Sequence, residues 1–213
     1  MNGAQPQTPL LPWEGAYYAS GFRSGLKLLV LGESQYVPEG QAWPNRPETY
    51  TLEVVQDFIK LDGRGSYTMD FAGRLHRILT GSDDPTERQV KEAWGRIAYA
   101  NYIPEIVGYG AIARKRSEHW QDGHQRLPEL LDDLEPDRVL VLGRATWLHI
   151  LHGRWSTHGE GWSIGGKQRG LWEFDVGGKV ALSSWIYHPS RSMDSIQMAR
   201  DVLDALIKMD NVR

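Results

Sequence analysis

Hydrophobic positions divide the chain into short apolar runs separated by amphipathic segments. Three largely apolar segments, 28–31, 96–102 and 138–142, each end at a glycine or at polar residues. Such short runs are typical of strands that are buried on both faces of a parallel sheet. After the first run, Gly32 is expected to let the backbone turn sharply. Two more strands are predicted at 170–176 and 179–186, joined by a hairpin turn at Gly177-Gly178.

Apolar residues at helical spacing predict helices between these strands. The predicted helices are Glu48–Lys60, Met69–Leu79, a third from Pro85 or Thr86 to Gly95, Ser117–Leu134 with a restart at Pro128, Thr146–Leu151, and a last one capped by Ser192 or Asp194 that runs to about Met209. Loops are predicted at 37–47, around Pro104 and Gly108, and at 154–167. Strands that alternate with helices predict one three-layer α/β/α domain with a mainly parallel central sheet. We expect this domain to cover residues 27–213, after a loose or wrapping N-terminal arm over residues 1–26.

Composition narrows the chemistry that is available. The 213 residues include no cysteine, which excludes disulfides, thiolate zinc sites, cysteine nucleophiles and cysteine-bound iron–sulfur clusters. The formal net charge of −3 argues against a surface coated with positive charge, although 24 Lys and Arg residues leave a local basic face open. No apolar run could span a bilayer and residues 1–12 do not resemble a signal peptide, so we expect a cytoplasmic protein that does not bind membranes.

Chemically versatile residues follow the predicted parallel strands. Because parallel strands end at one edge of a sheet, the edge should collect Glu33 and Tyr36, Asn101 and Tyr102, Gly143 and Arg144, and His188 and Ser190. A carboxylate such as Glu33 can orient or deprotonate a water molecule. The amide of Asn101 offers a donor and an acceptor together, which suits the edge of a nucleobase. An imidazole such as His188 can stabilise a departing anion.

These segments, taken in order, resemble the motifs of the uracil-DNA glycosylase superfamily. The stretch Gly32–Tyr36 resembles the first motif, with Glu33 where the family-4-like enzymes carry a catalytic glutamate. The stretch Asp70–Leu75 is similar to the segment whose phenylalanine, here Phe71, stacks on the flipped base. The matching segments further along are Asn101–Pro104, around the asparagine that reads the base, Val139–Gly143, the third strand with its glycine, and His188–Ser190, the second catalytic motif.

The resemblance implies a uracil-DNA glycosylase-like fold and cleavage of the N-glycosidic bond of uracil or another damaged base in DNA. It implies catalytic roles for Glu33 and His188. The substrate-binding residues that it implies are Gly32, Ser34, Tyr36, Phe71, Asn101, Ser190 and Arg191, with Arg191 or Met193 in a loop that wedges into the duplex. No metal or organic cofactor is expected, and a monomer that binds damaged or uracil-containing DNA is expected.

The first motif departs from the family pattern, because it lacks the usual proline and has Ser34 in place of an aspartate or asparagine. Two other functions therefore stay open: a non-catalytic module that binds a nucleotide or nucleic acid, and a hydrolase of a small nucleoside-like ligand. The acidic net charge and the long loop at 37–47 favour a small substrate. Structural interpretations stay open as well, since Phe71 could be a core residue and Asn101 could bond its own backbone.

Two smaller patterns have weaker functional interpretations. His149 and His152 are three residues apart on a predicted helix, a spacing that suits a metal, but the sequence shows no third ligand. The basic run Arg114-Lys115-Arg116 is either a solvated loop or a patch that contacts phosphate.

Overall fold

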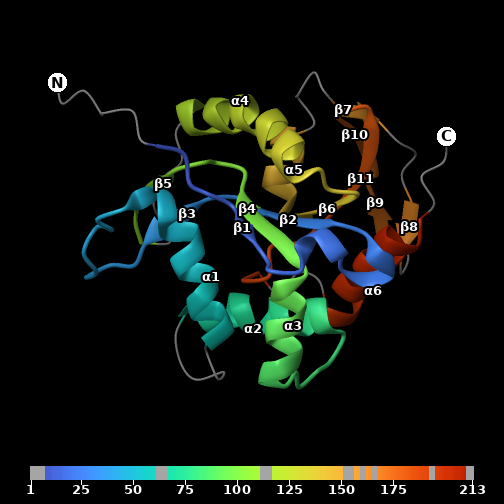
Figure 1. Cartoon of the computed structure of the whole chain (residues 1–213), viewed down its shortest axis with the longest axis horizontal. Coiled ribbons are helices and arrows are strands. Elements are labelled where there is room, and N and C mark those ends of the chain that lie inside the picture. Colours follow the sequence, from blue (N-terminus) through green and yellow to red (C-terminus); the bar gives the residue numbers. More distant parts are fainter. Residues whose placement is uncertain are drawn as a thin grey trace.

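A computed structural model describes residues 8–60, 67–110, 117–150, 156–158, 162–164, 167–191 and 195–209. Its centre is a seven-stranded sheet in the order β1-β4-β2-β6-β11-β10-β7 (Figure 1). In this order the strands are β1 (Trp13–Glu14), β4 (Ile97–Asn101), β2 (Leu28–Gly32), β6 (Arg138–Leu142), β11 (Lys179–Ile186), β10 (Trp172–Val176) and β7 (Ser156–His158). The inner strands β4, β2, β6 and β11 are parallel, and β1 and β10 run antiparallel to their neighbours. The mainly parallel sheet and the terminal hairpin are therefore confirmed.

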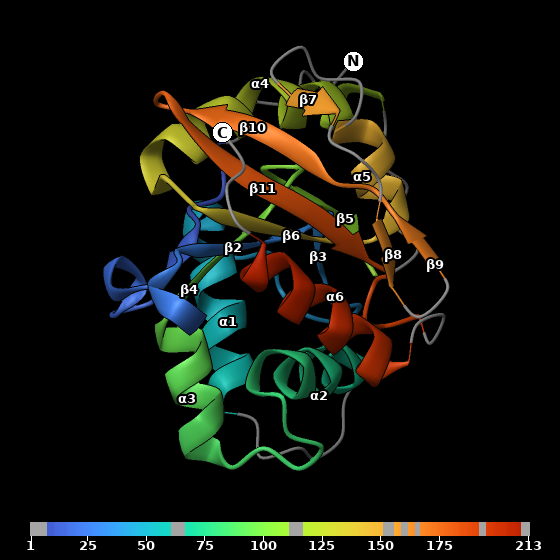
Figure 2. The same cartoon turned by 90° about the vertical axis from the view of Figure 1, so that its right-hand side faces the viewer.

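Helices cover both faces of this sheet, which confirms the α/β/α arrangement. The lower layer in Figure 1 contains α1 (Tyr50–Lys60), α2 (Tyr67–Thr80), α3 (Glu87–Gly95) and α6 (Ile196–Lys208). The opposite layer contains α4 (Ser117–Leu134) and α5 (Arg144–Ile150). In Figure 2, α6 lies beside α2 below the long hairpin of β10 and β11.

The two hydrophobic cores explain why the strand runs are continuously apolar. Leu28 and Val30 of β2 point into the core beneath α1, α2, α3 and α6, whereas Leu29 and Leu31 point into the core beneath α4 and α5. All four side chains are fully buried. A strand with helices on both faces has no solvent-facing position, so the usual alternation of apolar and polar residues disappears.

Most predicted helices are present, with corrections at their ends. Thr86 caps α3 in a capping box with Gln89, as its position in the sequence predicts. Ser195 caps α6, and the predicted caps Ser192 and Asp194 lie outside the described residues. The predicted restart at Pro128 is wrong, because α4 continues through this proline as one helix.

Some segments that were predicted as loops contain short strands. Within the predicted loop around Pro104 and Gly108, β5 (Ile106–Tyr109) pairs with β3 (Gln35–Val37). A short 3-10 helix, η3 (Pro47–Thr49), directly precedes α1. The segment predicted as a loop at 154–167 contains β7 and β8 (Trp162–Ile164), which pairs with β9 (Lys167–Arg169). Strands of three or four residues are too short to show a periodic pattern.

The described part of the N-terminal arm, residues 8–26, packs against the domain. β1 pairs with β4, and the indole Nε1 of Trp13 donates to the carbonyl of Trp94 at 3.0 Å. Two 3-10 helices follow, η1 (Tyr18–Ser20) and η2 (Arg23–Gly25), and the hydroxyl of Tyr18 donates to the carbonyl of Leu134 at 3.1 Å. The arm therefore extends the sheet by one strand.

Candidate functional site

The end of β2 is shaped by close packing between Gly32 and Asn101, which are opposite each other in the parallel ladder. A Cβ atom added to Gly32 would come under 3.0 Å from both Asn101 Oδ1 and the Tyr99 hydroxyl, closer than real Cβ atoms approach. Gly32 is the last residue of β2 and its φ is not positive, and the chain bends at the next residue, Glu33. This glycine leaves room for the side chain of Asn101.

Asn101 carries an unused donor in a buried position. Its side chain is 7% exposed, and its Oδ1 accepts a hydrogen bond of 3.5 Å from the hydroxyl of Tyr99. Its Nδ2 has no hydrogen-bond partner among the described residues. A buried donor without a partner is costly and uncommon in folded proteins. An acceptor on a ligand that reached Nδ2 would satisfy this donor.

His188 follows β11 in a tight turn that orients its ring. The backbone N–H of Ser190 donates to His188 Nδ1 at 3.3 Å, and Ser190 Oγ lies 2.7 Å from the same nitrogen. The backbone N–H of Arg191 donates to the carbonyl of His188 at 2.8 Å. Because Nδ1 accepts a hydrogen bond, the proton of the neutral ring is on Nε2. His188 can therefore donate from Nε2 to a substrate.

Phe71 on α2 lies against the imidazole of His188. The ring centroids are 5.1 Å apart with an interplanar angle of 29°, the geometry of two stacked rings in direct contact. The structure therefore brings these two predicted site residues together. Because the rings touch, no third ring fits between them in this arrangement. Phe71 also contacts Phe58 of α1, with ring centroids 5.7 Å apart, so it belongs partly to the hydrophobic core.

The strand ends place these groups on one side of the sheet. Gly143 directly follows β6 and has a φ of +114°. A Cβ added there would lie 3.7 Å from the Cβ of His188. Val30 and Tyr99 point into the core beneath α1, α2, α3 and α6, and Phe71 packs against the same core. Since side chains alternate along a strand, Gly32 and Asn101 face this same layer, two residues further along. Gly32, Phe71, Asn101 and His188 therefore share one face and one edge.

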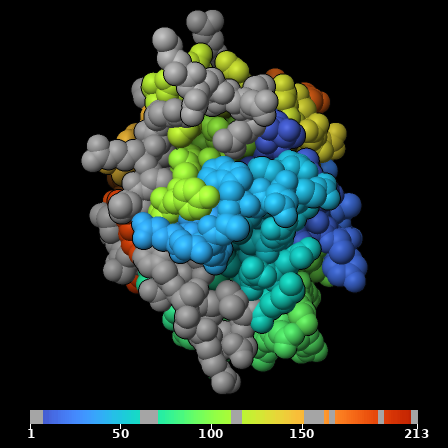
Figure 3. Space-filling model, turned by 90° about the vertical axis from the view of Figure 1, so that its left-hand side faces the viewer, coloured from blue at the N-terminus to red at the C-terminus, as the bar shows by residue number. Residues whose placement is uncertain are grey.

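Glu33 and its neighbours lie in the connection from β2 to β3. The carbonyl of Glu33 accepts a hydrogen bond of 2.9 Å from the N–H of Ile103, which ties Glu33 to the end of β4. The side chains of Glu33, Ser34 and Tyr36 are half-buried. The hydroxyl of Tyr50 donates to the carbonyl of Tyr36 at 3.4 Å. In Figure 3, β5 in yellow-green lies against the light-blue surface of this part of the chain.

Sequence reasoning missed two residues at this edge, Tyr99 and Gln35. The amide Oε1 of Gln35 accepts a hydrogen bond of 3.0 Å from the hydroxyl of Thr51, and both residues are buried. Tyr99 was detectable in the sequence, since it precedes Asn101 by two positions in a strand and therefore shares its face. No local pattern connects Gln35 to Thr51, because they belong to different elements.

The remaining predicted residues are more peripheral. Ser190, Arg191 and Arg144 are exposed at the ends of β11 and β6. The residues Met193, His152 and Arg114–Arg116 lie outside the described part of the chain.

His149 stacks on Trp120 of α4, on the other side of the sheet, with ring centroids 3.6 Å apart. Nearby, the hydroxyl of Tyr102 lies 2.6 Å from Nδ1 of His124. Burial raises the pKa of Tyr102, so its hydroxyl stays protonated.

The described segments contain neither a candidate metal centre nor a candidate membrane span. Within them, no three His, Asp or Glu side chains are grouped so that they could hold a metal ion. Over the same residues, no helix is long and apolar enough to cross a membrane.

Comparison with known proteins leaves the family open. No protein-family model matches the sequence, and no curated protein matches it.

Proposed function

We propose that this protein hydrolyses the N-glycosidic bond of a base that is flipped out of DNA, with uracil as the first candidate base. One observation carries the proposal: the buried Nδ2 of Asn101 has no hydrogen-bond partner among the described residues and is on the same edge and face of the sheet as the ring pair of Phe71 and His188. An enzyme that acts on a flipped base needs polar groups for the edge of the base and an aromatic surface for its face. The motif resemblance supports the same reaction.

The proposed mechanism assigns opposite charges to Glu33 and His188. As the bond between C1′ and the base nitrogen breaks, positive charge develops on the sugar and negative charge on the base. The carboxylate of Glu33 stabilises the sugar cation and orients the water that attacks C1′. The Nε2–H of His188 donates a hydrogen bond to the base anion. Water supplies the hydroxyl that remains on the sugar, and its proton neutralises the released base.

Substrate binding rearranges the aromatic pair in this proposal. In the free protein Phe71 covers His188, so Phe71 moves away from the imidazole when a base binds; the base then stacks on Phe71, and its edge meets Nε2 of His188. Arg191 and Arg144 are exposed beside this position, where their guanidinium groups can contact phosphates. These contacts would orient the DNA strand although the chain as a whole has a net charge of −3.

The test is a strand-cleavage assay on oligonucleotides that each contain one modified base, followed under single-turnover conditions. Glu33→Ala and His188→Ala should each lower the rate by at least about 100-fold, because each removes a group that stabilises the transition state. Both variants should unfold at the same denaturant concentration as the wild type. Glu92→Ala is the matched control, since Glu92 is an exposed carboxylate on α3 that pairs with Arg96 at 3.8 Å.

Other outcomes would identify a different function. Full activity of both variants on the preferred substrate would show that the mechanism is wrong. Binding of a base or nucleotide without turnover would support a non-catalytic module. Hydrolysis of a free nucleoside, with oligonucleotides left intact, would support a small-ligand hydrolase.

A further inference from the structure

We propose that Tyr99 is a positioning residue that holds the Asn101 amide in one of its two orientations, so that the site offers a hydrogen-bond donor to the base. This inference rests on the proposed function, because it names the chemical class of base that the same site selects. It assigns to the site a residue that makes no contact with the base itself.

The hydroxyl of Tyr99 has one hydrogen-bond partner among the described residues. Tyr99 is 4% exposed and Asn101 is 7% exposed, and both project from the same face of β4. The Tyr99 hydroxyl donates to Asn101 Oδ1 at 3.5 Å. The ring of Tyr99 packs edge-on against Trp94, with centroids 5.7 Å apart and an interplanar angle of 64°. Packing therefore holds the phenol where its hydroxyl reaches the amide.

The opposite amide orientation is less favourable. Burial raises the pKa of Tyr99, so its hydroxyl stays protonated and has a hydrogen to donate. With Nδ2 turned toward Tyr99, two donors would face each other, and that hydrogen would have no acceptor among the described residues. A buried donor without a partner costs more than an unused lone pair on a phenol oxygen. Oδ1 is therefore the atom that faces Tyr99.

Gly32 limits the movement of the amide as well. The position of its absent Cβ is in contact range of both the Tyr99 hydroxyl and Asn101 Oδ1, so the three residues form one packed unit. With Oδ1 held in this unit, Nδ2 is the amide atom left without a partner in the described structure. The substrate must then place an acceptor opposite Nδ2.

This arrangement selects keto bases over amino bases. Uracil presents a carbonyl oxygen at C4, which accepts from Nδ2, whereas cytosine presents an amino group at the same position. Two donors facing each other leave both without a partner, and a site built around one polar contact rejects the mismatched analogue strongly. Tyr99 thus sets the selectivity by preventing the amide from presenting its oxygen to an amino base.

The test titrates the full ¹⁵N-labelled chain with free uracil and with free cytosine, and follows the side-chain amide resonances of Asn101. The wild type should bind uracil more tightly than cytosine by at least about tenfold. In Tyr99→Phe the amide is free to turn its oxygen outward, so most of this preference should disappear. Tyr18→Phe is the matched control, because it also removes a buried hydroxyl, one that donates to the carbonyl of Leu134.

The ratio of the two affinities separates positioning from a structural effect, because general loosening would weaken both bases alike. An unchanged ratio in Tyr99→Phe overturns the inference, and so does a wild type in which neither base shifts the Asn101 resonances. The same spectra report whether the variant is folded. If the ratio changes as expected but oligonucleotides stay intact, the proposed function fails while the inference stands. If oligonucleotides are cleaved and the ratio is unchanged, the inference alone fails.

Discussion

Gly32, at the end of β2, has only a hydrogen atom as its side chain, and this leaves the space that the Asn101 side chain occupies. Gly32→Ala should displace the Asn101 amide and the Tyr99 hydroxyl, because both are in contact range of the added methyl group. Overpacking of this kind should lower the free energy of unfolding by about 1–3 kcal/mol. We expect base excision to fall by more than the loss of stability explains, since the displaced amide is the group that contacts the base in the proposed mechanism. Urea unfolding and the oligonucleotide assay measure the two effects.

Gly73→Ala provides the control for this substitution. Gly73 lies within α2, and apart from its chain neighbours and the backbone of its own helix, no atom of the described residues is within 4 Å of the position that its Cβ would occupy. Alanine there should raise the free energy of unfolding by roughly 0.5–1 kcal/mol, because glycine is a poor helix former. Equal effects of the two substitutions would contradict the packing role of Gly32.

Individual site residues were predictable to the extent that chain direction places them. Asn101 lies near the end of one segment that was recognised as a strand and His188 comes two residues after another, and parallel strands end at one edge. The contact between Phe71 and His188 depends on how α2 packs, which no local pattern reports. The role of Gly32 depends on the opposite strand, so its sequence position alone suggested a turn.

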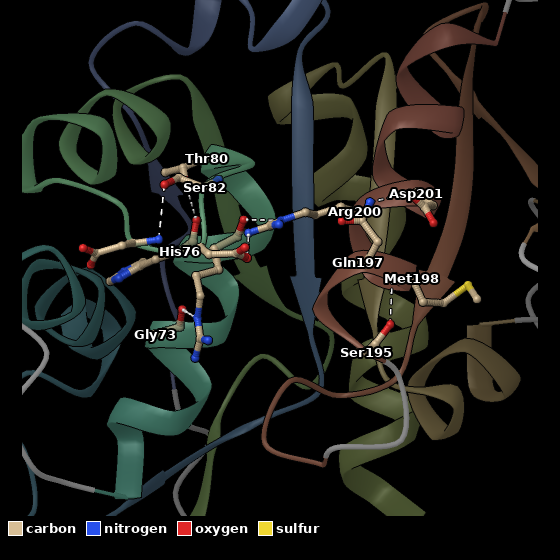
Figure 4. Close-up of polar contacts among 12 residues, drawn as sticks. Gly73, His76, Thr80, Ser82, Ser195, Gln197, Met198, Arg200 and Asp201 are labelled. Carbon is tan, nitrogen blue, oxygen red and sulfur yellow. Dashed lines mark hydrogen bonds and ion pairs between the residues drawn. The ribbon is translucent and has the colours of Figure 1, made fainter.

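The C-terminal end of α2 is held by arginines from distant parts of the chain. Nε of Arg200 on α6 donates to the carbonyl of Arg77 at 3.0 Å, and its Nη2 lies 2.9 Å from Asp83 Oδ1. Figure 4 shows Arg200 reaching from α6 to this end of α2. Arg23 donates to the carbonyl of Leu79 at 2.8 Å. Positive charge at this end satisfies free carbonyls and complements the helix dipole.

Arg200→Ala should lower the free energy of unfolding by roughly 1.5–3 kcal/mol, the usual contribution of a hydrogen bond to a charged group. The Arg200 side chain is only 11% exposed, so solvent screens its interactions weakly. Arg88→Ala on the exposed surface of α3 is the control and should have little effect. Similar losses in the two variants, measured by chemical denaturation, would argue against this function of Arg200.

Elements were predictable in proportion to their length. The five-residue strand β6 and the long helix α4 are where the apolar pattern placed them. The strands β3, β5, β8 and β9 are three or four residues long and gain their hydrogen bonds from partners that the local sequence does not reveal. Pro128 did not interrupt α4, because packing of Leu127 and Leu131 in the core outweighs the local preference.

The stability of the whole molecule should depend on pH through His76. This residue is buried on α2, with its ring edge-on to Trp94 at a centroid distance of 6.2 Å, and its Nε2 has no partner among the described residues. Burial lowers the pKa of His76 from 6.5 to about 4. Between about pH 4 and pH 6.5, His76 binds a proton in the unfolded chain but not in the native protein. The contribution of the neutral His76 ring to the free energy of unfolding is therefore fully present above about pH 6.5, and it is lost as the pH drops toward 4.

The expected loss is at most about 3.5 kcal/mol, because one pKa unit corresponds to about 1.4 kcal/mol and the pKa falls by about 2.5, from 6.5 to about 4. Urea unfolding of the wild type near pH 7 and near pH 4.5 should show most of this difference. His76→Leu removes the titrating group, so its stability should depend less on pH over the same range. An equally steep dependence in His76→Leu would show that other groups cause the acid sensitivity.

The overall architecture was predictable because alternating strands and helices permit few arrangements. The order of the strands was not predictable from the sequence. β4 is the direct neighbour of β2 in the sheet, although α1, α2 and α3 lie between them in the sequence. Which strands become neighbours depends on how these helices pack against the sheet. The chemistry at the edge follows from that order, because it puts Gly32 beside Asn101 and Gly143 near His188.

The seven-stranded sheet ends in very short strands on both sides, two residues in β1 and three in β7. A long open edge displays unpaired backbone groups that another molecule can extend, which is a common route to aggregation. Strands of two and three residues offer too few such groups to recruit a partner strand. The arm that forms β1 thus protects the inner strand β4, and with it Asn101, from pairing with a second copy of the chain.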